Sequence, residues 1–106
     1  MEKLYLNTVV SLSGRIDGQN ERKKLKLDEK DLNDNQYEVI ISNITRTINP
    51  SYFLGLFSYS IKKLGLPKFK RKYNFIMENK KDLSEGLKED IEEGIEWALD
   101  DSEILC

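Results

Sequence analysis

Residues 37–57 read YEVIISNITRTINPSYFLGLF, and this stretch decides the predicted fold. Its first part, Tyr37–Ser42, is a short β-branched run of the kind found in central strands. After a polar loop, Asn49 can cap a helix, and Pro50 suits the first helical turn. We therefore expect a strand at 37–42 that leads through a loop into a helix at about 50–64.

The helix expected at 50–64 has one apolar face with helical spacing. That face contains Phe53, Leu56, Phe57, Ser60, Ile61 and Leu64. Burial of each large apolar side chain contributes roughly 1.5–3 kcal/mol, so we expect this helix to be the main core element. Gly65, followed by Pro67, marks its carboxyl end.

The flanking sequence adds further elements. Residues 4–12 alternate in polarity, which predicts a strand with one buried face, and residues 73–77 predict another. Residues 17–35 favour a short helix carrying Arg22, Leu25 and Leu32, although 24–28 would also fit a short strand. A last helix is expected at about 83–100, capped by Asp82 or Ser84. Its buried face would contain Leu83, Leu87, Ile91, Ile95 and Ala98.

This β-α-β-α-β-α order predicts an α/β fold, with a mixed sheet of about four strands and helices packed against it. The 106 residues fit one domain, 1–106. The single cysteine, Cys106, can form no intrachain disulfide, which favours a reducing compartment. With neither a signal peptide nor a long apolar run, we expect a cytoplasmic protein that does not contact membranes. The excess of lysine over arginine and the many asparagines hint at a bacterial or phage source.

Composition also limits the chemistry. The chain contains no histidine, which excludes Ser-His-Asp and Cys-His nucleophilic sites and His-ligated zinc. Gly14 and Gly18 lack the spacing and the lysine of a phosphate-binding loop. We therefore expect no catalytic residue, no cofactor and no metal, and a function in binding another protein. The net charge of −2 gives no overall attraction to nucleic acid, so no direct nucleic-acid contact is expected.

Three stretches together resemble the STAS-like family, bacterial relatives of anti-anti-sigma factors. They are the strand at 37–42, the helix-opening segment 48–57 with its end at 63–65, and the earlier turn at 13–18. The resemblance covers about two thirds of the chain. It implies a small STAS-like domain that regulates a partner by protein binding, the partner being an ATPase of the histidine-kinase-like fold or another regulator.

In that family the matching turn reads Asp-Ser-Ser/Thr-Gly, and the partner kinase phosphorylates its second hydroxyl residue. Asn49, Pro50, Ser51 and Tyr52 stand at those four positions, and only Ser51 matches. The resemblance therefore makes Ser51 a candidate phosphoacceptor. A phosphate there would add about −1.5 to −2 charges beside a helix amino end, which favours anions. The alternative is that Ser51 simply occupies a first-turn position that suits small polar residues.

The other candidate partner contacts surround this turn or follow it along the helix. They are Arg46, Asn49, Pro50, Tyr52, Gly55 and Tyr59. Arg46 either contacts an acidic partner or is simply solvated. Gly55 lies within the helix, where glycine costs about 1 kcal/mol relative to alanine, so a partner or a neighbouring strand is expected to approach it closely.

Charge is segregated along the chain. Eight basic residues cluster between 62 and 81, just before the last helix, whereas Glu85 to Glu103 holds nine acidic residues and one basic residue, Lys88. One interpretation is a phage or mobile-element inhibitor that binds a basic host nucleic-acid-binding complex through Glu89, Glu92, Glu93 and Glu96. The other is an ordinary solvated helix face.

Overall fold

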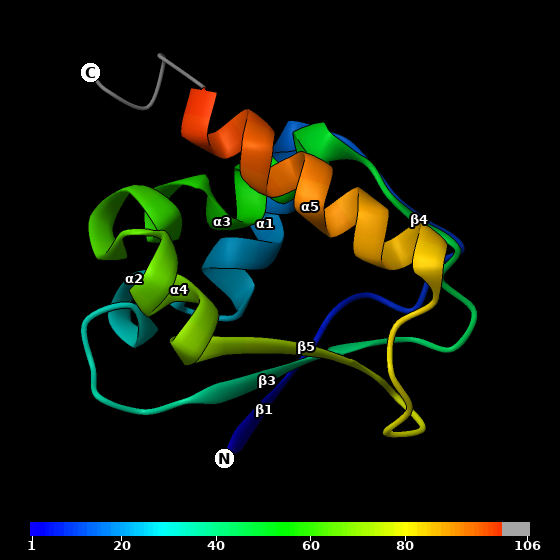
Figure 1. The fold of residues 1–106 in the computed structure, drawn as a ribbon, viewed down its shortest axis with the longest axis horizontal. Coiled ribbons are helices and arrows are strands. Elements are labelled where there is room, and N and C mark those ends of the chain that lie inside the picture. The colour runs from blue at the N-terminus through cyan, green and yellow to red at the C-terminus, as the bar shows by residue number, and fades with distance from the viewer. Residues whose placement is uncertain (101–106) are drawn as a thin grey trace.

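Three parallel strands form the main sheet of the computed structural model, which describes residues 1–100. They are β1 (Glu2–Tyr5), β3 (Tyr37–Ile41) and β5 (Tyr73–Met77), in the order β1-β3-β5. The register places Leu4 beside Val39 and Val39 beside Phe75. Figure 1 shows the sheet crossing the lower half of the molecule, with the helices on its upper side.

The α/β class is as predicted, but the expected mixed sheet is wrong, because every strand pair in residues 1–100 is parallel. The physical reason lies in the connections. Each chain segment between neighbouring strands of the main sheet contains helices, and such crossovers return the chain in the same direction. A second sheet pairs only β2 (Ser11–Leu12) with β4 (Thr47–Ile48), also in parallel.

The strand predicted at 4–12 is divided into β1 and β2. Between them the backbone leaves the main sheet and bonds to side chains. The Asn7 amide donates to Glu21 Oε1 at 3.1 Å, and Thr45 Oγ1 donates to the carbonyl of Val9 at 2.6 Å. These side-chain bonds take the place of backbone hydrogen bonds to the main sheet, and beyond β1 the chain bends towards β4.

Helix α3 (Pro50–Leu64) has the predicted bounds and forms the centre of the core. Its cap is Asn49, and Gly65 ends it with a φ of 82°. The helix packs against both α1 (Arg15–Lys24) and α5 (Glu85–Asp100). The Phe57 ring meets four other rings at centroid distances of 5.1–5.6 Å, those of Phe53, Phe69, Tyr73 and Phe75.

The segment 17–35 is helical, as favoured, but it holds two helices, α1 and α2 (Leu27–Lys30). Leu32, predicted to be carried by the short helix, lies beyond the end of α2 at Lys30 and is 67% exposed. A further helix, α4 (Leu66–Lys72), occupies the basic stretch for which no element was predicted. It is anchored by the buried ring of Phe69.

Helix α5 begins two residues later than predicted and buries the expected residues, with Leu83 partly buried just ahead of it. Ser84 Oγ accepts from the Leu87 amide at 3.3 Å, which identifies Ser84 as the capping side chain. None of the helices in residues 1–100 is long and apolar enough to cross a membrane. Cys106 and the last two acidic residues of the charged run, Asp101 and Glu103, lie outside the described residues.

Candidate functional site

The corner that joins β4 to α3 is held by its own backbone and by one side chain. The Asn49 amide donates to the carbonyl of Leu12 at 2.8 Å, which ties the corner to β2. Asn49 Oδ1 accepts from both the amide and the hydroxyl of Ser51, at 2.9 and 2.6 Å. Asn49 is exposed, and Pro50 and Ser51 are half-buried. The Ser51 hydroxyl therefore lies at the accessible first turn of a rigid helix.

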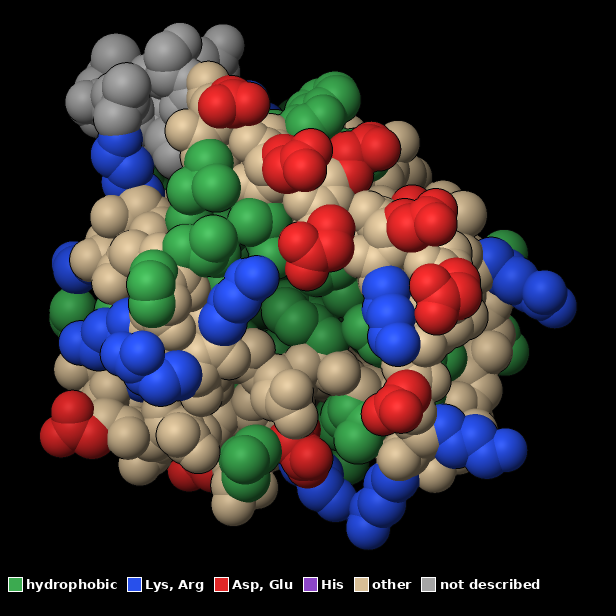
Figure 2. Space-filling view, viewed as in Figure 1, with side chains coloured by type: hydrophobic (Ala, Val, Ile, Leu, Met, Phe, Trp, Pro, Cys, Tyr) green, Lys and Arg blue, Asp and Glu red, His purple; other side chains and the backbone are tan. Residues whose placement is uncertain are grey.

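The acidic helix α5 meets this corner directly. Asp90 Oδ2 accepts from the Ile48 amide at 2.9 Å, just before the corner begins. The four glutamates singled out on α5, Glu89, Glu92, Glu93 and Glu96, are all exposed. Figure 2 shows acidic side chains following α5 along the upper part of the molecule. The two surfaces predicted separately are thus neighbours, joined through Asp90.

A shallow groove runs beside α5. Its volume is about 400 Å³, and its lining includes Phe69, Phe75 and Ile91. Lys70 of α4 lies on one rim and Glu92 of α5 on the other. In Figure 2 the apolar floor is visible between basic and acidic side chains. Trp97, further along α5, is 50% exposed.

The remaining predicted contacts do not all lie together. Arg46 is exposed, and its amide donates to the carbonyl of Val10 at 2.7 Å, which places it one strand before the corner. Tyr59 is 59% exposed but is eight residues beyond Ser51 on α3, about 12 Å along the axis. It lies over the Arg22 guanidinium, 5.9 Å from Cζ to the ring centroid. Tyr59 therefore belongs to a different surface.

Tyr52 is a core residue, which corrects its placement among the surface contacts. It is 1% exposed, because α3 is covered by other helices on more than one side. Among the described residues its hydroxyl has no hydrogen-bond partner. Burial raises the pKa of Tyr52 above its usual range, and the carboxylates of Glu21 and Asp17 raise it further.

Gly55 is also inaccessible to a partner. A Cβ at this position would lie 2.2 Å from the carbonyl oxygen of Arg15. The close approach expected there is therefore real, but the neighbour is helix α1 and neither a partner nor a strand.

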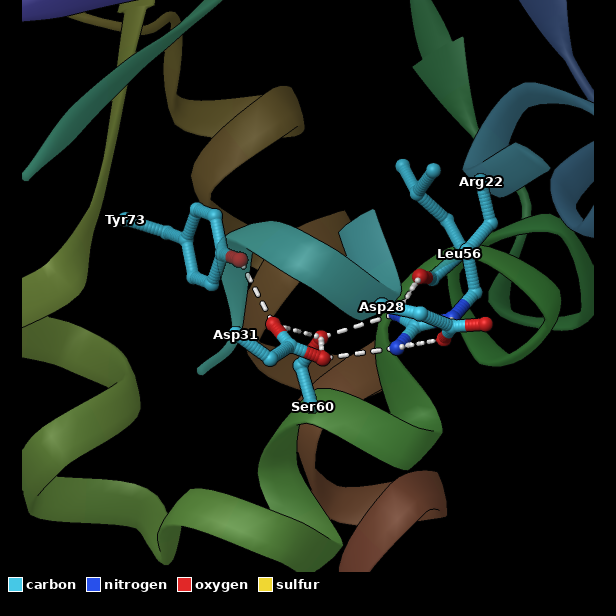
Figure 3. A network of polar contacts seen from close by, with 6 residues as sticks. All are labelled: Arg22, Asp28, Asp31, Leu56, Ser60 and Tyr73. Atoms are coloured by element: carbon cyan, nitrogen blue, oxygen red, sulfur yellow. Dashed lines mark hydrogen bonds and ion pairs between the residues drawn. The ribbon is translucent and has the colours of Figure 1, made fainter. Parts of the chain in front are cut away.

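A buried polar network was missed by the sequence reasoning. Asp31, whose side chain is 1% exposed, accepts from Arg22, Ser60 and Tyr73 (Figure 3). The Tyr73 hydroxyl donates at 2.5 Å, and burial followed by this bond raises its pKa above the usual range. The available signal was Ser60, a polar residue on the apolar face of α3, which needed a buried partner.

Ser60 is 0% exposed, so its hydroxyl cannot meet a substrate in the folded domain. Within residues 1–100, no three His, Cys, Asp or Glu side chains are placed to hold a metal ion together. The accessible features are the Asn49–Ser51 corner, the acidic face of α5 with its groove, and the surface around Tyr59.

Comparison of the chain with protein-family models, with curated proteins and with solved structures finds no match.

Proposed function

We propose that this chain is a cytoplasmic regulatory domain of STAS-like type that binds a partner protein through the corner Asn49–Ser51 and the adjacent acidic face of α5. The observation that carries the proposal is the position of Ser51. Its hydroxyl lies at the accessible first turn of α3, and the rest of that helix is the buried centre of the core. A modification of Ser51, or a partner bound there, therefore acts at the end of a helix whose remainder is packed in the core.

The stretches on which the STAS-like resemblance rests lie together in the folded chain. Residues 13–18, predicted as a turn, instead lead into and begin α1, and they are far from the segment 48–57 in sequence but adjacent to it in space. Asn49 bonds to Leu12, next to the early turn, and a Cβ on Gly18 would meet the carbonyl oxygen of Tyr52. The all-parallel sheet differs from the mixed sheet that the resemblance implied.

Phosphorylation at Ser51 would work through local charge. The amino end of a fifteen-residue helix stabilises an anion by about 0.3–1 kcal/mol. Transfer would break only the Ser51–Asn49 side-chain bond, and the exposed Asn49 can then bond to water. The added negative charge lies close to Asp90 and α5, so it strengthens the acidic character of the whole surface. A partner that docks an acidic side chain here would be released.

Incubation with ATP and a histidine-kinase-like ATPase, followed by intact-mass measurement, tests the switch. We expect the mass gain of one phosphate on the wild-type chain and none on Ser51→Ala. Ser84→Ala is the matched control, since Ser84 is also a serine at the start of a helix and is at least as exposed. If Ser51→Ala and Ser84→Ala reduce the mass gain equally, or if both variants gain the full mass of one phosphate, Ser51 is not the acceptor.

A second candidate function is the stoichiometric inhibitor of a host nucleic-acid-binding complex. It is favoured by four exposed glutamates on one helix, next to a groove that can take an apolar anchor and an exposed Trp97. The glutamates would compete for the basic surface that otherwise binds phosphates.

Charge reversal tests whether the acidic face of α5 is the docking surface of such an inhibitor. Substitution of Glu89, Glu92, Glu93 and Glu96 by lysine should abolish capture of a basic partner and the salt dependence of binding. The control carries the same charge change on exposed acidic residues elsewhere, Glu2, Glu29, Asp34 and Asp82. If both sets weaken binding equally, net charge alone accounts for it and the docking face is not α5.

A further inference from the structure

The surface around Tyr59 contains a pocket that the proposed function does not use. Its volume is about 350 Å³, and it lies where α1, α2 and the end of α3 meet. It is lined by Arg22, Asp28, Leu32, Tyr59, Lys62 and Lys63, with Asp31 behind them. The pocket therefore combines three cationic side chains with two exposed apolar ones.

Arg22 is fixed on the inner side of this pocket. Its Nη1 donates to the carbonyl of Leu56 at 2.9 Å and to Ser60 Oγ at 2.8 Å. Its Nη2 donates to Asp31 Oδ2 at 2.6 Å. The Arg22 side chain is only 9% exposed, so the guanidinium is held in place before any ligand arrives.

On its outer edge, the Arg22 guanidinium pairs with a carboxylate that a ligand could displace. Nε and Nη2 both reach Asp28 Oδ1, at 3.0 and 2.7 Å (Figure 3). The Asp28 side chain, however, is 88% exposed, and ion pairs to such exposed carboxylates contribute little stability. Asp28 therefore occupies a position that an incoming oxyanion can take without disturbing the buried bonds of Arg22.

The rest of the pocket suits a ligand with an anionic and an apolar part. Lys62 and Lys63 are exposed and supply two further positive charges. The Tyr59 ring and the Leu32 side chain, 59% and 67% exposed, offer apolar contact beside the guanidinium. A planar or aliphatic group can lie there while its oxyanion pairs with Arg22 in the two-pronged geometry typical of arginine.

We propose that this pocket binds a small organic oxyanion, a phosphate monoester or a carboxylate, whose anionic group displaces Asp28 from Arg22. The apolar part of the ligand lies against Tyr59 and Leu32. Binding ties α2 to the end of α3 through the ligand, on a surface that does not include Ser51. The inference is independent of the proposed function.

The test is a set of NMR titrations of the full chain with phenyl phosphate, benzoate and inorganic phosphate, followed through the Arg22 Nε–H signal. Phenyl phosphate and inorganic phosphate should both shift that signal, and phenyl phosphate should bind more tightly. Tyr59→Ala should remove the advantage of phenyl phosphate and leave inorganic phosphate unchanged. Comparison of phenyl phosphate with benzoate identifies which oxyanion the pocket prefers.

Asp28→Ala gives the sharpest readout, because loss of the competing carboxylate should tighten phenyl phosphate binding by up to about fivefold. Glu29→Ala is the matched control, since it removes the same charge from a neighbouring exposed position of α2. The joint variant Lys62→Ala and Lys63→Ala should weaken binding. Equal tightening by Asp28→Ala and Glu29→Ala, or no shift of the Arg22 signal with any of the three probes, would overturn the proposal.

Discussion

Gly18 of α1 and Gly55 of α3 pack against each other where the two helices cross. A Cβ built on Gly18 would lie 3.1 Å from the Cα of Gly55 and 2.2 Å from the carbonyl oxygen of Tyr52. Neither glycine has a positive φ, so both are needed for space and not for backbone conformation. The crossing sets how closely α1 approaches the core, and with it the position of Arg22.

Gly55→Ala is therefore expected to destabilise the domain even though alanine favours helices. Overpacking against backbone atoms costs typically about 1–3 kcal/mol, more than the gain of up to about 1 kcal/mol in helix propensity. Urea denaturation measures the change in unfolding free energy. The control is Gly86→Ala, a helical position where a Cβ meets nothing within 4 Å, and it should stabilise by roughly 0.5–1 kcal/mol. A stabilised Gly55→Ala would show that the helices can separate freely.

Two buried tyrosines should respond in opposite ways to loss of the hydroxyl. Tyr73→Phe leaves Asp31 short of a donor and should cost about 1–3 kcal/mol. Tyr52→Phe removes a buried hydroxyl that has no partner in residues 1–100, so stability should be unchanged or raised by about 1 kcal/mol. The same urea experiment compares them. A marked loss in Tyr52→Phe would indicate that a bound water satisfies that hydroxyl.

The same tyrosines predict a loss of stability in alkali. Both have folded pKa values raised above the unfolded value of about 10, mainly by burial. Below about pH 10, the stabilisation that follows from these raised pKa values is fully present. It is lost as the pH rises towards the folded pKa, because the two tyrosines then ionise in the unfolded chain before they ionise in the folded one. The unfolding free energy should fall by about 1.4 kcal/mol per pH unit for each tyrosine. In the double variant Tyr52→Phe and Tyr73→Phe, the unfolding free energy should fall less steeply with pH. An unchanged slope would assign the effect to other groups.

The Arg22–Asp31 pair should behave as a coupled unit. Removal of Arg22 leaves the buried Asp31 carboxylate without a cationic partner and should cost about 3–5 kcal/mol, and removal of Asp31 leaves Arg22 with only the exposed Asp28 as an ionic partner, whereas Arg22→Met with Asp31→Leu should cost much less than the sum. A double-mutant cycle by chemical denaturation measures the coupling free energy. Where a single variant fails to fold, Ser60→Ala, which removes one donor to Asp31, gives a milder member of the series. Strict additivity would contradict the coupling.

Loss of the Asn49 cap should weaken the start of α3. Asn49→Ala removes the acceptor for the Ser51 amide and hydroxyl, at an expected cost of about 0.5–2 kcal/mol. Asn49→Asp should retain the stability, because a carboxylate also caps. Amide hydrogen exchange at Ser51 should quicken in the alanine variant alone. Equal exchange in both variants would mean that the cap bond contributes nothing.

The elements that were predicted correctly contain their own start and stop signals. Helix α3 has a capping Asn49, a first-turn Pro50, a periodic apolar face and a terminal Gly65, and its bounds match. The strand β5 also matches its predicted bounds at 73–77. The position of the Asn49–Ser51 corner could be predicted for the same reason, since capping chemistry is local.

What could not be predicted depends on tertiary contacts. The buried residues of α1 are Gly18, Glu21 and Arg22, so its packing face carries no apolar periodicity. Helix α4 is short and basic, and it is secured by one ring, Phe69, which meets Phe57 at 5.2 Å. The burial of Tyr52 and Gly55 follows from the packing of α1 against α3, which nothing in the local sequence of α3 reveals.

The all-parallel sheet also has a consequence for the order in which the chain can fold. β1 begins at Glu2, but its partner residue is Tyr37, whose own partner on β5 is Tyr73. During synthesis from the amino end, the first strand must therefore wait, unpaired, until β3 has emerged from the ribosome. Contacts this distant in sequence slow folding towards the millisecond-to-second range typical of non-local topologies. In a nascent chain stalled before β5, the central strand β3 lacks its second partner and is an exposed edge of the sheet, open to pairing with other chains.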